Sequence, residues 1–185
     1  SNHLSIECTD GNITDSNIKS DEIYVKADTL NVNGTDIKSK NVTMDVENDI
    51  TLGTYHYTTC LDDAEYDKTS TVLEVNKPTK IHSGNTKIKC GKFIGIGTEF
   101  LGDELCINSK STIRFESTYD RTIEEYTERS GKSKISHYNE YVVSVVPKFD
   151  VDNINLQFGD IEAYFQAPHF KRYTKMTLPE SKGLI

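Results

Sequence analysis

Three stretches of this chain repeat the same alternation of apolar and polar residues: Leu4-Ser5-Ile6-Glu7-Cys8, Ile23-Tyr24-Val25-Lys26-Ala27 and Val42-Thr43-Met44-Asp45-Val46. Each stretch begins 19 positions after the one before it. Strict alternation is typical of a β-strand with one buried face, and a repeat of roughly 20 residues is typical of a solenoid. The chain is therefore predicted to form β-coils that stack on one another, because a single coil cannot bury its inner face.

A second, longer repeat interrupts the first. Gly34-Thr35-Asp36-Ile37 returns 63 positions later as Gly97-Thr98-Glu99-Phe100. The regular spacing is lost at residues 54–84 and 117–148, which both open with tyrosine-rich sequence, become acidic and return through an alternating apolar stretch. That pattern predicts two long β-hairpins. Because they begin at matching places in the longer repeat, we expect them to project from the same side of the rod as parallel flaps that can pair.

These patterns predict an all-β chain with one domain. Residues 1–165 are predicted to form a single β-helix segment with coils of about 19 residues and the two hairpins as extra-helical flaps. A right-handed parallel β-helix is expected, since crossover connections between parallel strands are almost always right-handed. Residues 166–185, where the alternation fades, are predicted to be an irregular tail. The coils are expected at about residues 3–21, 22–40, 41–53, 85–103, 104–116 and 149–163.

The composition narrows the class of protein. The 185 residues are 35% hydrophobic, lack tryptophan and carry a formal net charge of -8. The acidic balance and the lack of a basic cluster argue against a nucleic-acid partner. Because the repeat is already in phase at Leu4, we expect the chain to be a piece of a longer protein.

Cysteine and histidine positions do not suggest a metal centre or a cofactor site. Cys8 and Cys90 are predicted to face inward, Cys106 outward, and Cys60 lies in the first excursion, so a disulfide framework is not expected. The chain has no CxxC pair, and no histidine lies at metal-ligand spacing to another histidine or cysteine. We therefore expect neither a bound metal nor a cofactor.

A family resemblance is carried by residues 42–53, Val42-Thr43-Met44-Asp45-Val46-Glu47-Asn48-Asp49-Ile50-Thr51-Leu52-Gly53. This stretch resembles the L-x-L-x-A-x-x-D-I-x-L repeat of filamentous hemagglutinins and of the related contact-dependent growth-inhibition exoproteins of Gram-negative bacteria. The excursions are similar to the hemagglutinin-repeat region of those proteins, and the resemblance covers roughly residues 4–165. The small residue of the repeat is kept as Cys8, Ala27 and Cys90 but replaced by Val46 and Ser109 elsewhere.

The resemblance implies a location and a set of partners. Proteins of this family are right-handed parallel β-helices, exported by two-partner secretion through an outer-membrane transporter and displayed at the bacterial surface. Their repeat region forms a shaft that projects a receptor-binding or toxin-bearing part, and its later repeats are linked to toxin passage across the target's outer membrane. The implied function is a non-catalytic rod that contacts a target-cell envelope or receptor.

Two other functions remain open on the sequence alone. The chain would be a stand-alone adhesin if the flaps bound a receptor or glycan, and the candidate contact residues are Tyr55, Tyr57, Tyr66, Tyr119, Tyr126, Tyr138 and Tyr141. Cross-strand tyrosine pairs also stabilise hairpins, which is the simpler explanation. A β-helix carbohydrate-active enzyme would need carboxylates such as Asp45, Glu47 and Asp49 to converge in a groove, but their alternation with buried residues predicts a solvated strand face. Open coil ends would also allow copies to stack end to end.

Overall fold

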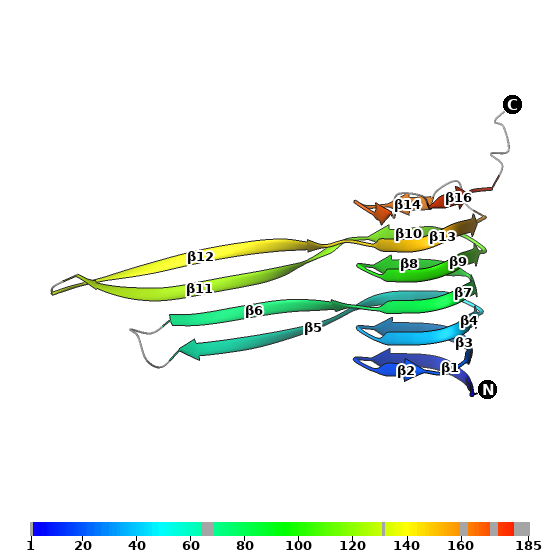
Figure 1. The fold of residues 1–185 in the computed structure, drawn as a ribbon, viewed down its shortest axis with the longest axis horizontal. Coiled ribbons are helices and arrows are strands. Elements are labelled where there is room, and N and C mark those ends of the chain that lie inside the picture. The colour runs from blue at the N-terminus through cyan, green and yellow to red at the C-terminus, as the bar shows by residue number, and fades with distance from the viewer. Residues whose placement is uncertain (1, 64–68, 131, 160–162, 171–173, 180–185) are drawn as a thin grey trace, which may run out of the picture.

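The computed structural model describes residues 2–63, 69–130, 132–159, 163–170 and 174–179, and these residues form β-strands and turns without a helix. The described residues thus contain no apolar helix long enough to cross a membrane. Parallel and antiparallel pairs join the strands into one curled, mixed sheet (Figure 1). The strands are β1 His3–Thr14, β2 Asn17–Lys19, β3 Glu22–Asn33, β4 Asp36–Val46, β5 Asp49–Asp63, β6 Thr69–Pro78, β7 Lys80–Cys90, β8 Lys92–Ile96, β9 Glu99–Ser109, β10 Ile113–Glu116, β11 Thr118–Ser130, β12 Ser133–Val145, β13 Lys148–Gln157, β14 Ala163–Phe165, β15 His169–Phe170 and β16 Lys175–Thr177.

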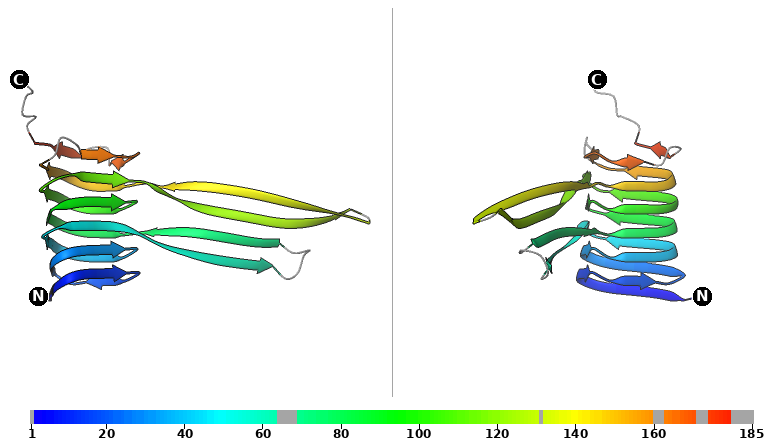
Figure 2. Two further views of the ribbon diagram at one scale, coloured as in Figure 1. Left: turned by 180° about the vertical axis from the view of Figure 1, so that it is seen from behind. Right: turned by 60° about the vertical axis from the view of Figure 1, so that its left-hand side comes forward.

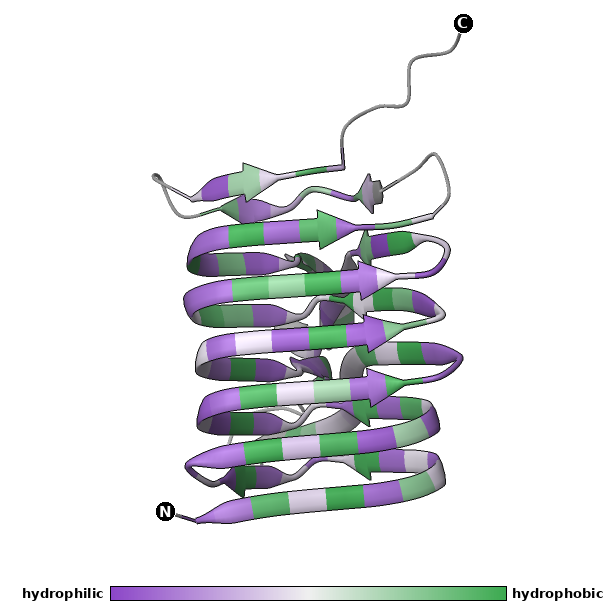
Figure 3. Cartoon of the chain, turned by 90° about the vertical axis from the view of Figure 1, so that its right-hand side faces the viewer, coloured by the Kyte–Doolittle hydropathy of each residue, from purple (hydrophilic) through white to green (hydrophobic). Residues whose placement is uncertain are grey.

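Parallel pairing stacks the coils in the register that the sequence repeat predicts. Leu4 pairs with Ile23, and Ile23 pairs with Val42, each 19 positions further along the chain. Across the first excursion Val42 pairs with Thr86, and Thr86 pairs with Leu105. Residues that are 63 positions apart, such as Val42 and Leu105, therefore occupy equivalent positions two coils apart. Figure 3 shows the coils lying one above another, with polar and apolar residues alternating along each ribbon.

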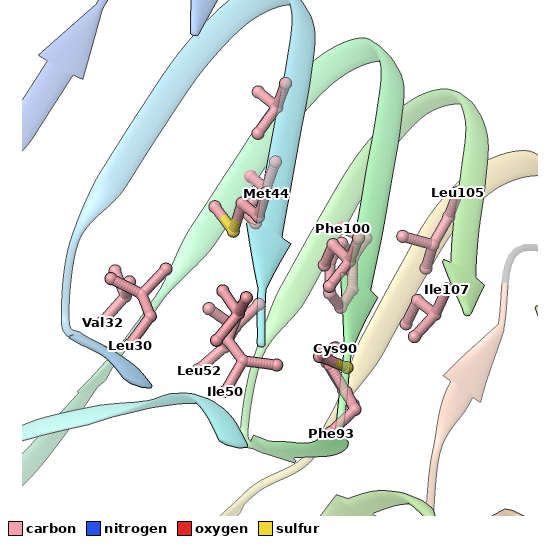
Figure 4. Close-up of a cluster of buried hydrophobic side chains, with 14 of the residues drawn as sticks. Leu30, Val32, Met44, Ile50, Leu52, Cys90, Phe93, Phe100, Leu105 and Ile107 are labelled. Atoms are coloured by element: carbon pink, nitrogen blue, oxygen red, sulfur yellow. The ribbon is translucent and has the colours of Figure 1, made fainter. Parts of the chain in front are cut away.

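The core is a narrow column of inward side chains at the centre of the coils. The residues predicted to face inward from the second and third repeats, among them Val25, Val42 and Met44, are buried, whereas Leu4, Ile6 and Cys8 of the first repeat are partly buried and pack against this core. Cys90 is fully buried in the same column, and this burial raises the pKa of its thiol to about 12, so that it packs as an apolar side chain. Figure 4 shows aliphatic residues from several coils in contact within this column.

Aromatic rings replace aliphatic side chains in the core of the later coils. Phe115 of β10 is fully buried, and its ring centroid lies 4.9 Å from that of Phe149 and 5.1 Å from that of Phe93. Phe165 stacks on Phe115 at 5.0 Å. Each ring belongs to a different strand, so one cluster joins three successive coils.

One corner of the coils has either an unusual backbone conformation or a hairpin. The register aligns four residues with positive φ at this corner: Asp15, Gly34, Gly97 and Ala167. In the two remaining coils the hairpins occupy the same place, because residues 54–78 and 117–146 connect strands that elsewhere are joined through this one residue. Glycine adopts positive φ without a steric penalty, which accounts for Gly34 and Gly97. Each hairpin thus replaces a single corner residue.

Buried hydroxyl groups reinforce the same corner. Thr35, Thr79 and Thr98 follow it in successive coils and are fully buried. The Thr79 hydroxyl lies 2.7 Å from the carbonyl oxygen of Gly53, and that of Thr98 lies 2.7 Å from the carbonyl oxygen of Leu52. These bonds satisfy backbone carbonyl groups where the strands turn, so the chain can leave for a hairpin without exposing the core.

The two predicted hairpins form and pair with each other. β5 pairs with β6 over Thr54–Pro78, and β11 pairs with β12 over Thr118–Val145. β11 also pairs with β6, so that Arg121 lies opposite Glu74 and the order β12-β11-β6-β5 makes one antiparallel sheet. Successive coils lie about 4.8 Å apart along the rod, which is also the distance between neighbouring strands of a sheet. Two hairpins that leave the rod two coils apart therefore meet edge to edge. Figures 1 and 2 show the resulting blade projecting from one side of the rod.

The irregular tail predicted for residues 166–185 is wrong in part, because the described residues there include β15 and β16. Both pair in parallel with β13, with Phe149 opposite Phe170 and Ile154 opposite Met176. Phe170 stacks on Phe149 at 4.9 Å and, like Met176, packs against the core. These partners lie 21 and 22 positions apart instead of 19, so the longer connection hides the repeat.

Glu99 forms ion pairs with lysines of the two neighbouring coils, and these pairs can be tested by substitution. Its carboxylate accepts hydrogen bonds from Lys148 at 2.9 Å and lies 3.1 Å from Lys80, and its side chain is 14% exposed. Burial raises the pKa of Glu99, but the two lysines outweigh that effect and hold it below the ordinary value of 4.5. Glu99 is therefore expected to stabilise the fold above that value and to lose this contribution as the pH falls through its lowered pKa.

We expect Glu99→Gln to lower the free energy of unfolding by about 1 kcal/mol near neutral pH. Urea unfolding of the wild type and the variant, measured from about pH 7 to about pH 3, checks this. The difference between the two stabilities should shrink towards the acidic end, as the wild-type carboxyl group becomes protonated. A difference that stays constant with pH would contradict this role for Glu99.

Candidate binding surface on the hairpin sheet

The antiparallel register decides which hairpin side chains lie together. Residues directly opposite each other on neighbouring antiparallel strands point to the same face of the sheet. Tyr57 lies opposite Val75, Leu73 opposite Thr122, and Thr122 opposite Tyr141. With the alternation along each strand, these pairs define two faces across all four strands.

The first face, called here the aromatic face, carries Tyr55, Tyr57, Tyr126 and Tyr141. The rings of Tyr55 and Tyr57 stack at 6.2 Å, and the Tyr126 ring stacks on His137 at 4.4 Å. Tyr141 is 53% exposed, Tyr57 40% and Tyr126 37%. Four aromatic residues on one uncovered face therefore provide a rigid and amphipathic contact surface.

Apolar residues extend the aromatic face, and the tyrosine-based prediction did not include them. Leu61, Ile135 and Val143 lie on this face and are exposed, with Val143 at 64%. Leu73 and Val75 lie between them on β6 and are half-buried. The alternation of Tyr141, Val143 and Val145 contained the signal for these residues. It became interpretable once the pairing of the strands was known.

The second face, called here the charged face, carries Tyr119 and Tyr138. Between them Arg121 donates to Glu140 at 2.7 Å and lies 3.9 Å from Glu74, so one guanidinium group joins β11 to both neighbouring strands. The hydrogen bond to Glu140 raises the pKa of Arg121. The Tyr138 hydroxyl lies 3.2 Å from Glu140. The candidate tyrosines thus divide between two chemically different faces.

Tyr66, the remaining candidate, lies outside the described residues. The other six candidates are placed as follows: Tyr55 and Tyr57 in β5, Tyr119 and Tyr126 in β11, and Tyr138 and Tyr141 in β12.

Contacts at the base hold the sheet to the rod. Lys77 donates to Asp15 of the first coil at 2.8 Å. The Asn76 backbone amide donates to the Asp120 carboxylate at 2.7 Å, and the Asn76 side chain donates to the Tyr119 carbonyl oxygen at 2.6 Å. These bonds join the two hairpins where they leave the coils. The base of the sheet is therefore fixed, whereas both faces further out remain uncovered.

Grooves along the coils have a different character. One open groove of about 540 Å³ runs across the coils, and its lining includes Glu7, Lys26, Asp45 and Lys89. Glu7 and Lys26 lie 3.0 Å apart, and Asp45 lies 3.9 Å from Lys89. The outward carboxylates of this region thus form a ladder of alternating charge that neutralises itself. Among the described residues no group of three or more metal-ligating side chains comes together.

Comparison of the chain with protein-family models, with curated proteins and with solved structures finds no match.

Proposed function

We propose that this chain is a non-catalytic rod segment of a large secreted surface protein of the filamentous hemagglutinin or contact-dependent growth-inhibition type. The observation that carries the proposal is the uncovered aromatic face, held on a sheet that projects from stacked coils. In this proposal the coils form a right-handed parallel β-helix, in keeping with the usual hand of crossover connections.

The proposed mechanism is mechanical. Stacked coils lengthen the rod, and the hairpin sheet supplies the surface that contacts a target-cell envelope or a receptor on it. The parent protein would leave the cell through an outer-membrane two-partner secretion transporter and act at the bacterial surface. The regular 19-residue register supports the rod, because each coil adds the same rise without a change in its cross-section.

A stand-alone adhesin is the second candidate function. The stacked Tyr55 and Tyr57 rings on β5 and the exposed Tyr141 on β12, which lie on the same face, favour it, because tyrosine supplies large contact areas with few rotatable bonds. Both candidate functions use the aromatic face. They differ in whether the isolated chain shows saturable binding to cells. A receptor or glycan would be the ligand in the adhesin, whereas in the rod the face would add contacts along a much larger protein.

The two faces of the sheet give a matched test. The triple variant Tyr57→Ala/Tyr126→Ala/Tyr141→Ala should weaken binding of the labelled chain to intact cells by about tenfold or more, because buried aromatic contacts dominate most interfaces. The control variant Tyr119→Ala/Tyr138→Ala removes exposed tyrosines from the charged face of the same hairpins. Flow cytometry on bacterial and host cells provides the measurement. Equal loss from both variants, or no loss from either, would contradict the proposed surface.

A further inference from the structure

The outer edge of the hairpin sheet is an unpaired strand. β12 pairs with β11 on one side, and none of the other described strands pairs with its second side. Figure 1 shows it at the outer edge of the blade. Such an edge presents a row of backbone amide and carbonyl groups that can accept another strand.

This edge lacks the usual protection against pairing. Residues 133–145 contain no proline or glycine, and Lys134 and Glu140 are their only acidic or basic residues other than His137. Glu140 is already neutralised by Arg121 at 2.7 Å. Tyr141, Val142 and Val143 form an exposed run of strong β-formers without a charge. On a chain with a net charge of -8, β12 is thus a neutral edge where two copies can approach.

We propose that β12 binds the β12 strand of a second copy of this chain, antiparallel, about a two-fold axis at Asn139. In this register each residue faces the one that lies equally far on the other side of Asn139. Ile135 then faces Val143, and His137 faces Tyr141, all on the aromatic face. On the charged face Tyr138 meets Glu140, so that no like charges oppose each other. The strand can therefore pair with its own copy without opposing like charges, and with apolar or aromatic residues facing each other on the aromatic face, as a two-fold interface requires.

Geometry favours this arrangement over a head-to-tail one. Antiparallel pairing of β12 of one copy with β5 of another would place both rods on the same side, where the coils that extend beyond β5 on one rod would meet those of the neighbour (Figure 1). Antiparallel pairing of two β12 strands places the rods at opposite ends of the joined sheet. The two aromatic faces then become continuous. This lateral contact is distinct from end-to-end stacking of coils.

A charge swap at the two-fold axis tests the proposal. Sedimentation equilibrium of the wild-type chain should show a monomer–dimer equilibrium. Asn139→Lys and Asn139→Asp should each raise the dimer dissociation constant at least about tenfold, because like charges then face each other at the axis. An equimolar mixture of the two variants should restore the dimer as a heterodimer, and Asn139→Gln should dimerise like the wild type.

Several outcomes would overturn the proposal. A wild-type chain that stays monomeric at high concentration has no such interface. Open-ended oligomers would indicate head-to-tail or end-to-end contacts in place of a two-fold one. Variants that dimerise unchanged, or a mixture that does not recover, would show that Asn139 does not lie on the axis. Because Asn139 lies on a hairpin away from the rod, circular dichroism should show that each variant remains folded.

Discussion

Replacing Phe115 with alanine is expected to lower the free energy of unfolding by about 3–5 kcal/mol, the typical cost of removing a buried phenylalanine ring. Phe115 is fully buried, and its ring contacts those of Phe93, Phe149 and Phe165 from three other strands. Neighbouring coils hold these rings in place, so the cavity left by the substitution cannot close easily. Urea unfolding followed by circular dichroism measures the effect.

The matched control is Tyr164→Ala in β14. Tyr164 is 44% exposed and points outward, with the Arg114 guanidinium 5.3 Å from its ring centroid. Its loss should cost about 1 kcal/mol or less, since an exposed cation–π contact contributes little. If Phe115→Ala cost no more than this control, the aromatic cluster would not be what joins the later coils.

The second large effect is expected at a glycine that only the structure identifies. Gly102 in β9 has a φ of 147°, a conformation that other residues rarely adopt. A Cβ atom built there would overlap the carbonyl oxygen of Ser83 in the coil below. Gly102→Ala is therefore expected to cost about 3 kcal/mol or more, from backbone strain together with displacement of β7.

Gly84→Ala is the control for this substitution. Gly84 lies at the same corner one coil earlier, without positive φ, and a Cβ atom there would lie 3.1 Å from the Lys40 carbonyl oxygen. A small shift accommodates that contact, so the expected change is about 1 kcal/mol or less. The two melting temperatures, compared in one buffer, check the difference. Equal melting temperatures would show that the corner tolerates side chains at Gly102.

Much of the rod could be predicted because a strand has a period of two and stacked coils repeat that period in register. Once Leu4, Ile23 and Val42 align, every second residue along the strand stretch that each of them begins must point inward, and the structure buries Ile23, Val25, Val42 and Met44 accordingly. The hairpins were predictable because they break this register at equivalent points. Their mutual pairing follows from a coil rise and a strand spacing that are the same.

Other features depend on long-range geometry that the pattern does not contain. The corner position is occupied by Asp15, Gly34, Gly97 and Ala167. Because these are three different residue types, the sequence does not mark the position, and only the positive φ angle identifies it. Strands β15 and β16 were missed because their partners in β13 lie 21 and 22 positions earlier in the chain, instead of the 19 positions of the repeat.

The candidate surface was predictable in composition but not in arrangement. Tyrosines were evident in the excursions, yet a shift of one residue in strand register would exchange the two faces. The register places Tyr57 and Tyr141 on one face and Tyr138 on the other. Only this register shows that Val143, which has no distinctive chemistry, belongs to the aromatic face.

Deleting the hairpins tests most directly the claim that the rod folds by itself and that the sheet is the binding surface. Residues 54–78 and 117–146 would each be replaced by one glycine, as at Gly34 and Gly97, where the chain turns the same corner without a hairpin. Cooperative unfolding of this variant and its binding to intact cells would be measured beside the full chain. We predict that the variant remains a folded β-protein and loses cell binding. A folded variant that binds as well as the full chain, or a rod that cannot fold without its hairpins, would contradict the account.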